Sequence, residues 1–168
     1  MKVHGDENMT GIKLTLAQMA DAENILEFYH SFIGTEGCTW DEKYPGLEHI
    51  HMDIQAKNLF FYKDEKGIVA TISIDSDEQV DSLKNWTITN AKEAARLAVR
   101  KDMQNTGIAR KMLLCLMEEL KNRGYEGIHF LVSPGNPAAL ASYEKLSFTN
   151  RGTVFLYDHE WYCYEKRV

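Results

Sequence analysis

The stretch LAVRKDMQNTGIARKMLLCLMEEL, residues 97–120, decides how the rest of the chain is organised. It begins with apolar residues typical of a strand and continues, after a polar turn, into an amphipathic helix predicted over residues 107–123. The apolar positions of that helix recur every three or four residues: Ile108, Ala109, Met112, Leu113, Leu116, Met117 and Leu120. Side chains at this spacing form one broad apolar stripe, which predicts a helix packed on a sheet.

The turn between this strand and this helix has the features of an anion site. Gly107 lets the backbone approach a ligand closely, and the amides of residues 104–109 have no intrahelical acceptor. Arg110 and Lys111 lie in the first helical turn, where the helix dipole disfavours a cation by about 0.3–1 kcal/mol. A phosphate or pyrophosphate would offset both effects. The alternative is an ordinary turn that needs Gly107 only for its dihedral angles, and the fingerprints GxxxxGK[ST] and GxGxxG are absent.

Outside this stretch, changes in hydrophobic period predict an alternation of strands and helices. Upstream we expect a strand over residues 12–16, helices over 21–33 and 46–57, and a hairpin of strands 59–63 and 67–74. Residues 75–92 show neither period and are expected to form a loop with one short element. Downstream we expect strands 93–99 and 126–132, a helix over 137–146, and strands 149–157 and 159–166. This order predicts a mixed sheet flanked by helices, the α/β (α+β) class.

Length and composition narrow the class further. The chain has 168 residues, with 19 Lys or Arg and 25 Asp or Glu, and therefore a formal charge of −6. We expect one domain over residues 11–168 after a flexible N-terminus at residues 1–10. The longest apolar run, Met112 to Met117, is far shorter than the roughly 18 residues of a membrane span. The absence of a secretion signal and of CxxC pairs predicts a cytoplasmic protein, and the net charge argues against broad nucleic-acid binding.

Two motifs resemble a known family. QNTGIA, residues 104–109, matches the R/Q-x-x-G-x-G/A signature of the GNAT superfamily of N-acetyltransferases, and it lies between a strand and a helix as it does there. NPAALASYEKLSF, residues 136–148, resembles the family's next block, N-x-x-A-x-x-x-Y-x-x-x-G-F. Ser147 replaces the usual Gly at a helix stop, which costs some backbone strain but affects no chemistry. The resemblance covers nearly the whole chain and implies a mostly antiparallel central sheet of about six or seven strands with about four flanking helices.

The resemblance implies a direct transfer of an acetyl group from acetyl coenzyme A (acetyl-CoA) to a primary amine of a small molecule, peptide or protein, without a metal. The cosubstrate would bind in a V-shaped opening between strands 93–99 and 126–132. Its pyrophosphate would lie on the amides of residues 104–109, its pantetheine would pair with the backbone of residues 97–99, and the amide near Val99 would polarise the thioester. The implied cofactor-binding residues are Leu97, Ala98, Val99, Gln104, Asn105, Thr106, Gly107, Ile108, Ala109, Arg110, Asn136, Ala139 and Tyr143.

By the family pattern, Tyr143 is the general acid that protonates the departing thiolate. A phenol of pKa about 10 donating to a thiolate of pKa about 8.5 works uphill by roughly 2 kcal/mol, so water could take its place, and a packed aromatic is the plainer interpretation. Glu93, six residues before Val99, is the first candidate for the general base. Asp75 is a weaker one, and Glu93 is equally explained as a solvated residue at a strand edge.

The acceptor is less defined than the cosubstrate. Phe32, Trp40, Tyr44 and Trp86 fall where the family builds its acceptor pocket, although core packing explains some of them. The acidic run Asp75, Asp77, Glu78 and Asp81 would attract a cationic amine, unless it is a solvated loop. A non-catalytic acyl-CoA-binding or sensor domain is the competing hypothesis, and the C-terminal strand pair offers an edge for a homodimer.

The remaining reactive residues have plain structural explanations. His49 and His51 alternate in a predicted helix and point apart, which is poor metal-ligand geometry. His129 lies in a buried-looking strand and is interpreted as a structural histidine. Cys38 has no basic partner nearby in the sequence that would make it a nucleophile.

Overall fold

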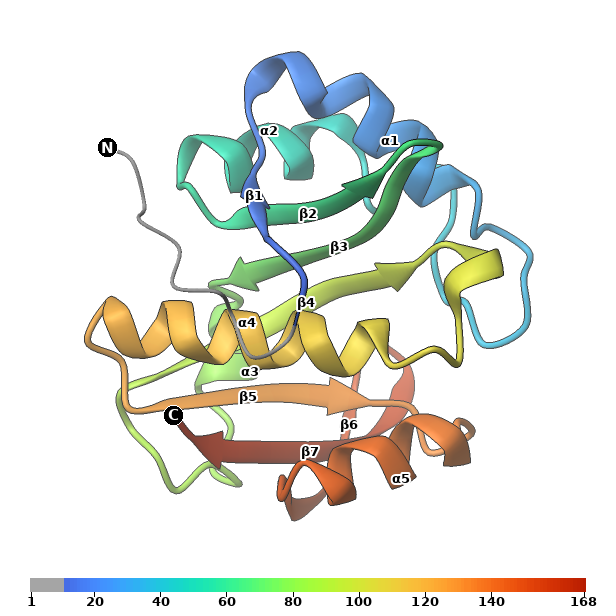
Figure 1. Ribbon diagram of the computed structural model, residues 1–168. Helices are drawn as coiled ribbons and strands as arrows, with labels where there is room; N and C mark the ends of the chain where they lie inside the picture. Colours follow the sequence, from blue (N-terminus) through green and yellow to red (C-terminus); the bar gives the residue numbers. More distant parts are fainter. Residues whose placement is uncertain (1–10) are drawn as a thin grey trace.

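A computed structural model describes residues 11–168 (Figure 1). The flexible N-terminus predicted for residues 1–10 lies outside the described residues. The strands are β1 (Thr15–Leu16), β2 (Leu59–Asp64), β3 (Gly67–Asp75), β4 (Ala91–Val99), β5 (Gly127–Val132), β6 (Thr149–Leu156) and β7 (His159–Arg167). The α-helices are α1 (Ala22–His30), α2 (Leu47–Gln55), α3 (Glu78–Asp81), α4 (Ile108–Asn122) and α5 (Pro137–Lys145), with single 3-10 turns at Met19–Asp21 and Lys101–Met103.

The strands form one seven-stranded sheet in the order β1-β2-β3-β4-β5-β7-β6. Every neighbouring pair is antiparallel except β4 and β5, which run parallel and are joined by α4. The mixed, mostly antiparallel α/β class expected from the sequence is therefore confirmed. None of the helices within residues 11–168 has both the length and the apolar character needed to cross a membrane.

Two apolar clusters cover the two faces of the sheet. On one face the stripe of α4, including Met112, Leu116 and Leu120, packs on strand residues such as Ile72 and Ile128, and all five side chains are fully buried. On the opposite face α1 and α2 cover β2 through a second cluster that includes Ile25, Ile50 and Leu59. Figure 1 shows α4 lying across the sheet with α1 and α2 gathered at the β1 and β2 edge. Successive residues of a strand point to opposite sides of the sheet, so each cluster takes alternate residues of the strands that it covers.

Element boundaries differ from the predicted ones mainly at helix ends. The helix predicted over residues 21–33 ends at His30, because the amides of Phe32 and Ile33 turn back to carbonyls only three residues away. The strand predicted over residues 12–16 pairs only at Thr15 and Leu16. The loop predicted over residues 75–92 contains one short helix, α3, as expected. Ser147 adopts the left-handed conformation, φ 65°, that its place at a helix stop implied.

Candidate active site

The defining feature of the site is the point where β4 leaves β5. The two strands pair at Ala91, Lys92 and Glu93, and no pairing between them continues beyond that point. A bulge in β4 accompanies the separation: the register with β3 shifts between Thr71 and Ser73, and Arg96 takes a left-handed φ of 51°. The edge of β4 from Ala94 to Val99 therefore faces an opening instead of a strand. This is the opening that the sequence analysis expected between these two strands.

A cavity of about 800 Å³ occupies this opening. Leu113, Phe130 and Tyr143 line it from the face of the sheet that α4 covers. Asp75 and Glu93, which lie opposite each other on β3 and β4, line it from the other face. Because both faces contribute, the cavity extends through the sheet at the gap. Its remaining lining comes from β4 and β5 themselves, from α2 and the loop before it, from the α3 region, and from the turn between β6 and β7 with the start of β7.

Tyr143 reaches the cavity from the second turn of α5. Asn136 begins that helix, with its side-chain oxygen accepting a hydrogen bond from the amide of Ala139 at 3.2 Å, and Pro137 occupies the first helical position. The Tyr143 ring packs edge-on against Phe130, with 4.8 Å between ring centroids. Burial raises the pKa of the Tyr143 hydroxyl, so the phenol is protonated at neutral pH and can donate a hydrogen bond.

Glu93 is a buried carboxyl group with an unsatisfied oxygen. Only 9% of the residue is exposed, and its Oε2 atom has no hydrogen-bond partner among residues 11–168. Burial raises the pKa of Glu93 to about 9, and the negative charges of Asp75, Asp77 and Asp81 add to the effect. A carboxyl group in this environment holds its proton at neutral pH and becomes a strong proton acceptor once it is ionised, which is the property a general base needs.

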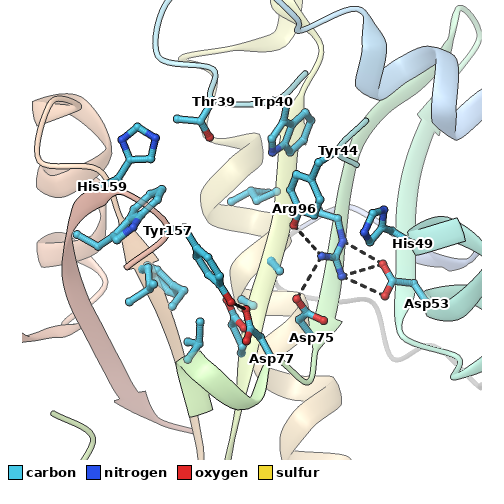
Figure 2. A pocket seen from close by; sticks show the side chains of 18 of the residues that line it. Thr39, Trp40, Tyr44, His49, Asp53, Asp75, Asp77, Arg96, Tyr157 and His159 are labelled. Carbon is cyan, nitrogen blue, oxygen red and sulfur yellow. Dashed lines mark hydrogen bonds and ion pairs between the residues drawn. The ribbon is translucent and has the colours of Figure 1, made fainter. Parts of the chain in front are cut away.

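Arg96 forms a buried ion-pair network on the floor of the cavity (Figure 2). Its guanidinium donates to both carboxylate oxygens of Asp53 at 3.0 Å, to the Tyr44 hydroxyl at 3.1 Å and to Asp75 at 3.2 Å. Burial opposes the charge of Arg96, but Asp53 and its other partners outweigh burial and raise its pKa. The same network engages one oxygen of Asp75, so Asp75 is a poorer candidate for a base than Glu93.

Negative charge predominates in the cavity. Four carboxyl groups line it, those of Asp53, Asp75, Asp77 and Glu93, while Arg96 is the only Lys or Arg among the lining residues. Figure 2 shows Asp77 on the wall opposite α2, where it accepts a hydrogen bond from the hydroxyl of Tyr157. Asp75 and Asp77 therefore belong to the cavity and are not solvated loop residues, whereas Glu78 is exposed. This charge favours a cationic ligand.

The turn before α4 lies at the other end of β4. Asn105 and Gly107 both have left-handed φ values, 60° and 87°. Gly107 is the N-cap of α4 and has no side chain to accept from the first helical amides, so these amides are available to an anion. A methyl group on Gly107 would meet no atom of the described residues within 4 Å, so this surface is open. The side chain of Gln104 donates to the Val99 carbonyl at 3.0 Å and ties the turn to β4.

Of the four aromatic residues expected at the acceptor pocket, two line the cavity and two do not. Trp40 and Tyr44 line the cavity. Phe32 packs behind Trp40, with 6.0 Å between centroids, and Trp86 stacks on His129 at 4.3 Å. Neither of these two lines the cavity. Phe32 packs against Phe28 of α1, and Trp86 covers the buried His129 of β5.

His129 has structural contacts, as its interpretation expected, whereas His49 lines the cavity. His129 is buried and hydrogen-bonds Asp81 through Nε2 at 2.8 Å. His49 accepts a hydrogen bond from the amide of Gly46 at 2.9 Å at the start of α2. Within residues 11–168 no three His, Cys, Asp or Glu side chains are placed to hold a metal ion.

Sequence reasoning missed Arg96, Asp53 and Tyr157. The signal for Arg96 was present: an arginine inside AARLAV, an otherwise apolar strand, is buried with the strand and needs carboxylate partners. The sequence does not reveal that the partner is Asp53, because these residues are 43 positions apart. Tyr157 gave no signal, since it follows an ordinary strand.

Comparison with known proteins was made for both sequence and structure. A search of curated proteins finds no sequence match. Among solved structures, the chain is similar to a ribosomal-protein-alanine N-acetyltransferase from Brucella melitensis, at 20% identity and a TM-score of 0.74, covering 94% of this chain and 100% of that one. It is also similar to a GNAT-family acetyltransferase from Streptococcus agalactiae, at 19% identity and a TM-score of 0.75, covering 94% and 96%.

A third structure was solved with a ligand. The chain is similar to yncA from Salmonella typhimurium, determined with its cofactor acetyl-CoA, at 16% identity and a TM-score of 0.72, covering 93% of each chain. At these identities the structural matches establish the fold. The family rests on the sequence: the model of the acetyltransferase (GNAT) family matches residues 21–148, well over half of the chain, and the protein belongs to that family.

Proposed function

We propose that the protein is an N-acetyltransferase that moves an acetyl group from acetyl-CoA directly to a primary amine carrying positive charge. The observation that carries this proposal is the cavity through the sheet, with a protonated phenol on one face and a buried carboxyl group on the other. Family membership supports acyl transfer, and the acetyl-CoA of the Salmonella structure supports the choice of cosubstrate.

The residues of this chain fit acetyl-CoA at three places. The amides of residues 104–109 would receive the pyrophosphate, and the exposed Arg110 lies within reach of it. The backbone of Leu97, Ala98 and Val99, which has no β5 partner, would pair with the pantetheine as an added strand. Asn136 and Ala139 would contact the cosubstrate from the start of α5.

Acid and base would act from the two faces of the sheet. Once its carboxyl group is ionised, Glu93 accepts a proton from the ammonium group of the acceptor, and the resulting neutral amine attacks the thioester carbonyl. An amide near Val99 stabilises the oxyanion that develops there. As the carbon–sulfur bond breaks, the attacking nitrogen loses its second proton, which passes by way of the Tyr143 hydroxyl to the departing sulfur. Because burial raises the pKa of Tyr143, it acts chiefly as a hydrogen-bond donor to the developing thiolate.

The acceptor is proposed to be cationic on the basis of the cavity charge. Arg96 is balanced by Asp53, which leaves Asp75 and Asp77 as surplus negative charge beside Glu93. An amine with a second positive group would interact favourably with both carboxylates.

Cosubstrate binding is tested by changing Gly107. We expect Gly107→Val to reduce acetyl-CoA affinity at least ten-fold, because a β-branched side chain strains the left-handed backbone and blocks the amides. Gly124 is a matched control: its φ of 88° equals that of Gly107 within a degree, it is equally open, and it lies at the far end of α4. Isothermal titration calorimetry should show wild-type affinity for Gly124→Val. Equal affinity in the two variants would contradict a pyrophosphate site at the amides of residues 104–109.

The acceptor class is tested with a panel of amines: n-butylamine, 1,4-diaminobutane, spermidine, a lysine-containing peptide and a peptide with an N-terminal alanine. We expect the multiply charged amines to have the highest kcat/KM, and Asp77→Asn to raise their KM several-fold with little change in kcat. Glu78→Gln, a change of the exposed neighbouring acid, is the control. A wild-type protein that binds acetyl-CoA but acetylates no amine would indicate an acyl-CoA-binding or sensor domain.

The base is tested by Glu93→Gln. With a pKa of about 9, Glu93 is protonated in the free enzyme at pH 7, so wild-type kcat/KM should rise as pH approaches 9. The variant should lose roughly 10²–10⁴-fold in rate at pH 7, and its remaining rate should rise only toward the acceptor pKa, because it depends on amine that is already neutral. Unchanged pH dependence in the variant would indicate that water, and not Glu93, removes the proton from the ammonium group.

The same variant should be more stable than the wild type. The raised pKa means that native Glu93 keeps a proton which the unfolded chain, with a pKa near 4.5, releases as pH rises. Wild-type stability attributable to Glu93 is therefore lost between pH 4.5 and 9, and Glu93→Gln should gain roughly 1–3 kcal/mol at pH 7. Urea unfolding at pH 5 and pH 8 should show the gain increasing with pH, and Glu118→Gln on the exposed side of α4 should show none.

The acid is tested by Tyr143→Phe. We expect kcat to fall roughly 10²-fold with an unchanged dissociation constant for acetyl-CoA, since the ring packing on Phe130 is kept. Tyr125→Phe, a change of another half-buried tyrosine on the same core, is the control. Wild-type kcat in Tyr143→Phe would make Tyr143 a packing residue.

A further inference from the structure

A row of ionisable side chains crosses the sheet beside the cavity. Asp75 lies opposite Glu93, Glu93 lies beside His129, and His129 lies opposite Glu165, on β3, β4, β5 and β7 in turn. Residues at directly paired positions point to the same face of a sheet, so all four side chains project to the face away from α4. Ionisable side chains are seldom buried, so a row of four across a covered part of a sheet is unusual.

The two central members of this row have unsatisfied atoms. His129 is 3% exposed, and its Nδ1 atom has no hydrogen-bond partner among the described residues. Glu93 is 9% exposed, and its Oε2 atom is equally without a partner. A buried polar atom without a partner costs about 1–3 kcal/mol, and two of them at paired positions call for an explanation.

The carboxylates at the two ends of the row, Glu165 and Asp75, are already engaged by other groups. The Glu165 carboxylate accepts from the amides of Thr87 and Ile88 and from Arg151, and although burial opposes ionisation, these donors lower its pKa. At the other end, Arg96 engages Asp75. Neither carboxylate is suited to taking a proton from its neighbour.

His129 is instead connected to the protein surface through Asp81. Its Nε2 atom hydrogen-bonds Asp81 at 2.8 Å, and the Asp81 side chain is 32% exposed. The indole of Trp86 stacks on the imidazole at 4.3 Å and 7°, and its own Nε1 donates to the carbonyl of Val80 at 2.7 Å. The ring is thus held with Nε2 on a partly exposed carboxylate, while Nδ1 is left without a partner among the described residues.

We propose that His129 and Asp81 carry to solvent the proton that Glu93 removes from the acceptor amine. This inference rests on the proposed acetyl transfer. Acetylation of an ammonium by a thioester yields an amide, a thiol and one released proton, so each turnover must export one. The proton passes from the ammonium nitrogen to Glu93 Oε2 and then, across one intervening water, to His129 Nδ1. The Nε2 proton of His129 leaves to Asp81, and Asp81 releases it to solvent.

The test compares kcat of wild type, His129→Gln and Asp81→Asn across pH 6 to 10, with 1,4-diaminobutane or the best acceptor of the amine panel at saturation. Glutamine and asparagine keep a hydrogen-bonding group but cannot relay a proton. Both variants should lose roughly ten-fold or more in kcat at pH 7. The deficit should shrink as pH rises toward the acceptor pKa, because the amine then enters without the extra proton. A structural defect would lower kcat equally at every pH.

Several charged groups face the relay, and all of them except Asp81 are common to the variants. Asp75 on β3, Arg96 on β4, and Asp77 and Asp81 around α3 act on Glu93, while Glu165 on β7 lies beside His129. Asp81→Asn also removes one of the charges that raise the pKa of Glu93, so His129→Gln, which leaves all of these charges in place, gives the decisive ratio of rates.

Two controls separate the relay from other effects. Trp86→Phe weakens the stack on His129 but keeps its bond to Asp81, and His30→Gln changes an exposed histidine on α1. Both should retain the wild-type pH dependence. A rate ratio that does not vary with pH would overturn the relay while leaving acetyl transfer intact. A wild-type protein that acetylates none of the amines would instead overturn the proposed function.

Discussion

The separation of β4 from β5 is the constraint on which the rest of the molecule depends. Parallel strands normally pair along their length, and backbone groups left unpaired in a core are costly. Here the bulge at Arg96, whose left-handed φ is itself unfavourable by about 1–3 kcal/mol, directs the second half of β4 away from β5. The opening that results gives the chain a cavity through its sheet and a free strand edge to which a ligand can add.

The same bulge sends the Arg96 side chain into the part of the cavity that α2 and the loop before it line. A buried guanidinium is tolerated only with close partners, and Asp53, Asp75 and Tyr44 supply them from three separate segments. Such a network adds little net stability, since desolvation offsets most of the attraction. Its contribution here is geometric: it holds α2, the loop before it and the end of β3 in fixed positions around the site.

In the proposed reaction, charge in the cavity links acceptor binding to proton transfer. Asp75, Asp77 and Asp81 attract a cation and, by the same repulsion, help to keep Glu93 protonated until a cation arrives. An ammonium beside Glu93 lowers the cost of ionising it, so binding of the acceptor prepares the base. The released proton then needs a route through a buried surface, which is why the row that joins Glu93 to His129 bears on function.

The sequence by itself determined the elements, the α/β class, the turn at Gly107 and the placement of Tyr143, because helix periodicity, glycine conformation and capping by Asn136 are local properties. It also singled out Glu93, but not its raised pKa, which arises from burial and from acids on other segments. Only the tertiary structure decided that Arg96 pairs with Asp53, that Trp86 covers His129 and that Asp77 faces the cavity. Arg96 and Asp53 are 43 positions apart in the sequence, and so are Trp86 and His129. No pattern in a single chain specifies which distant side chains meet.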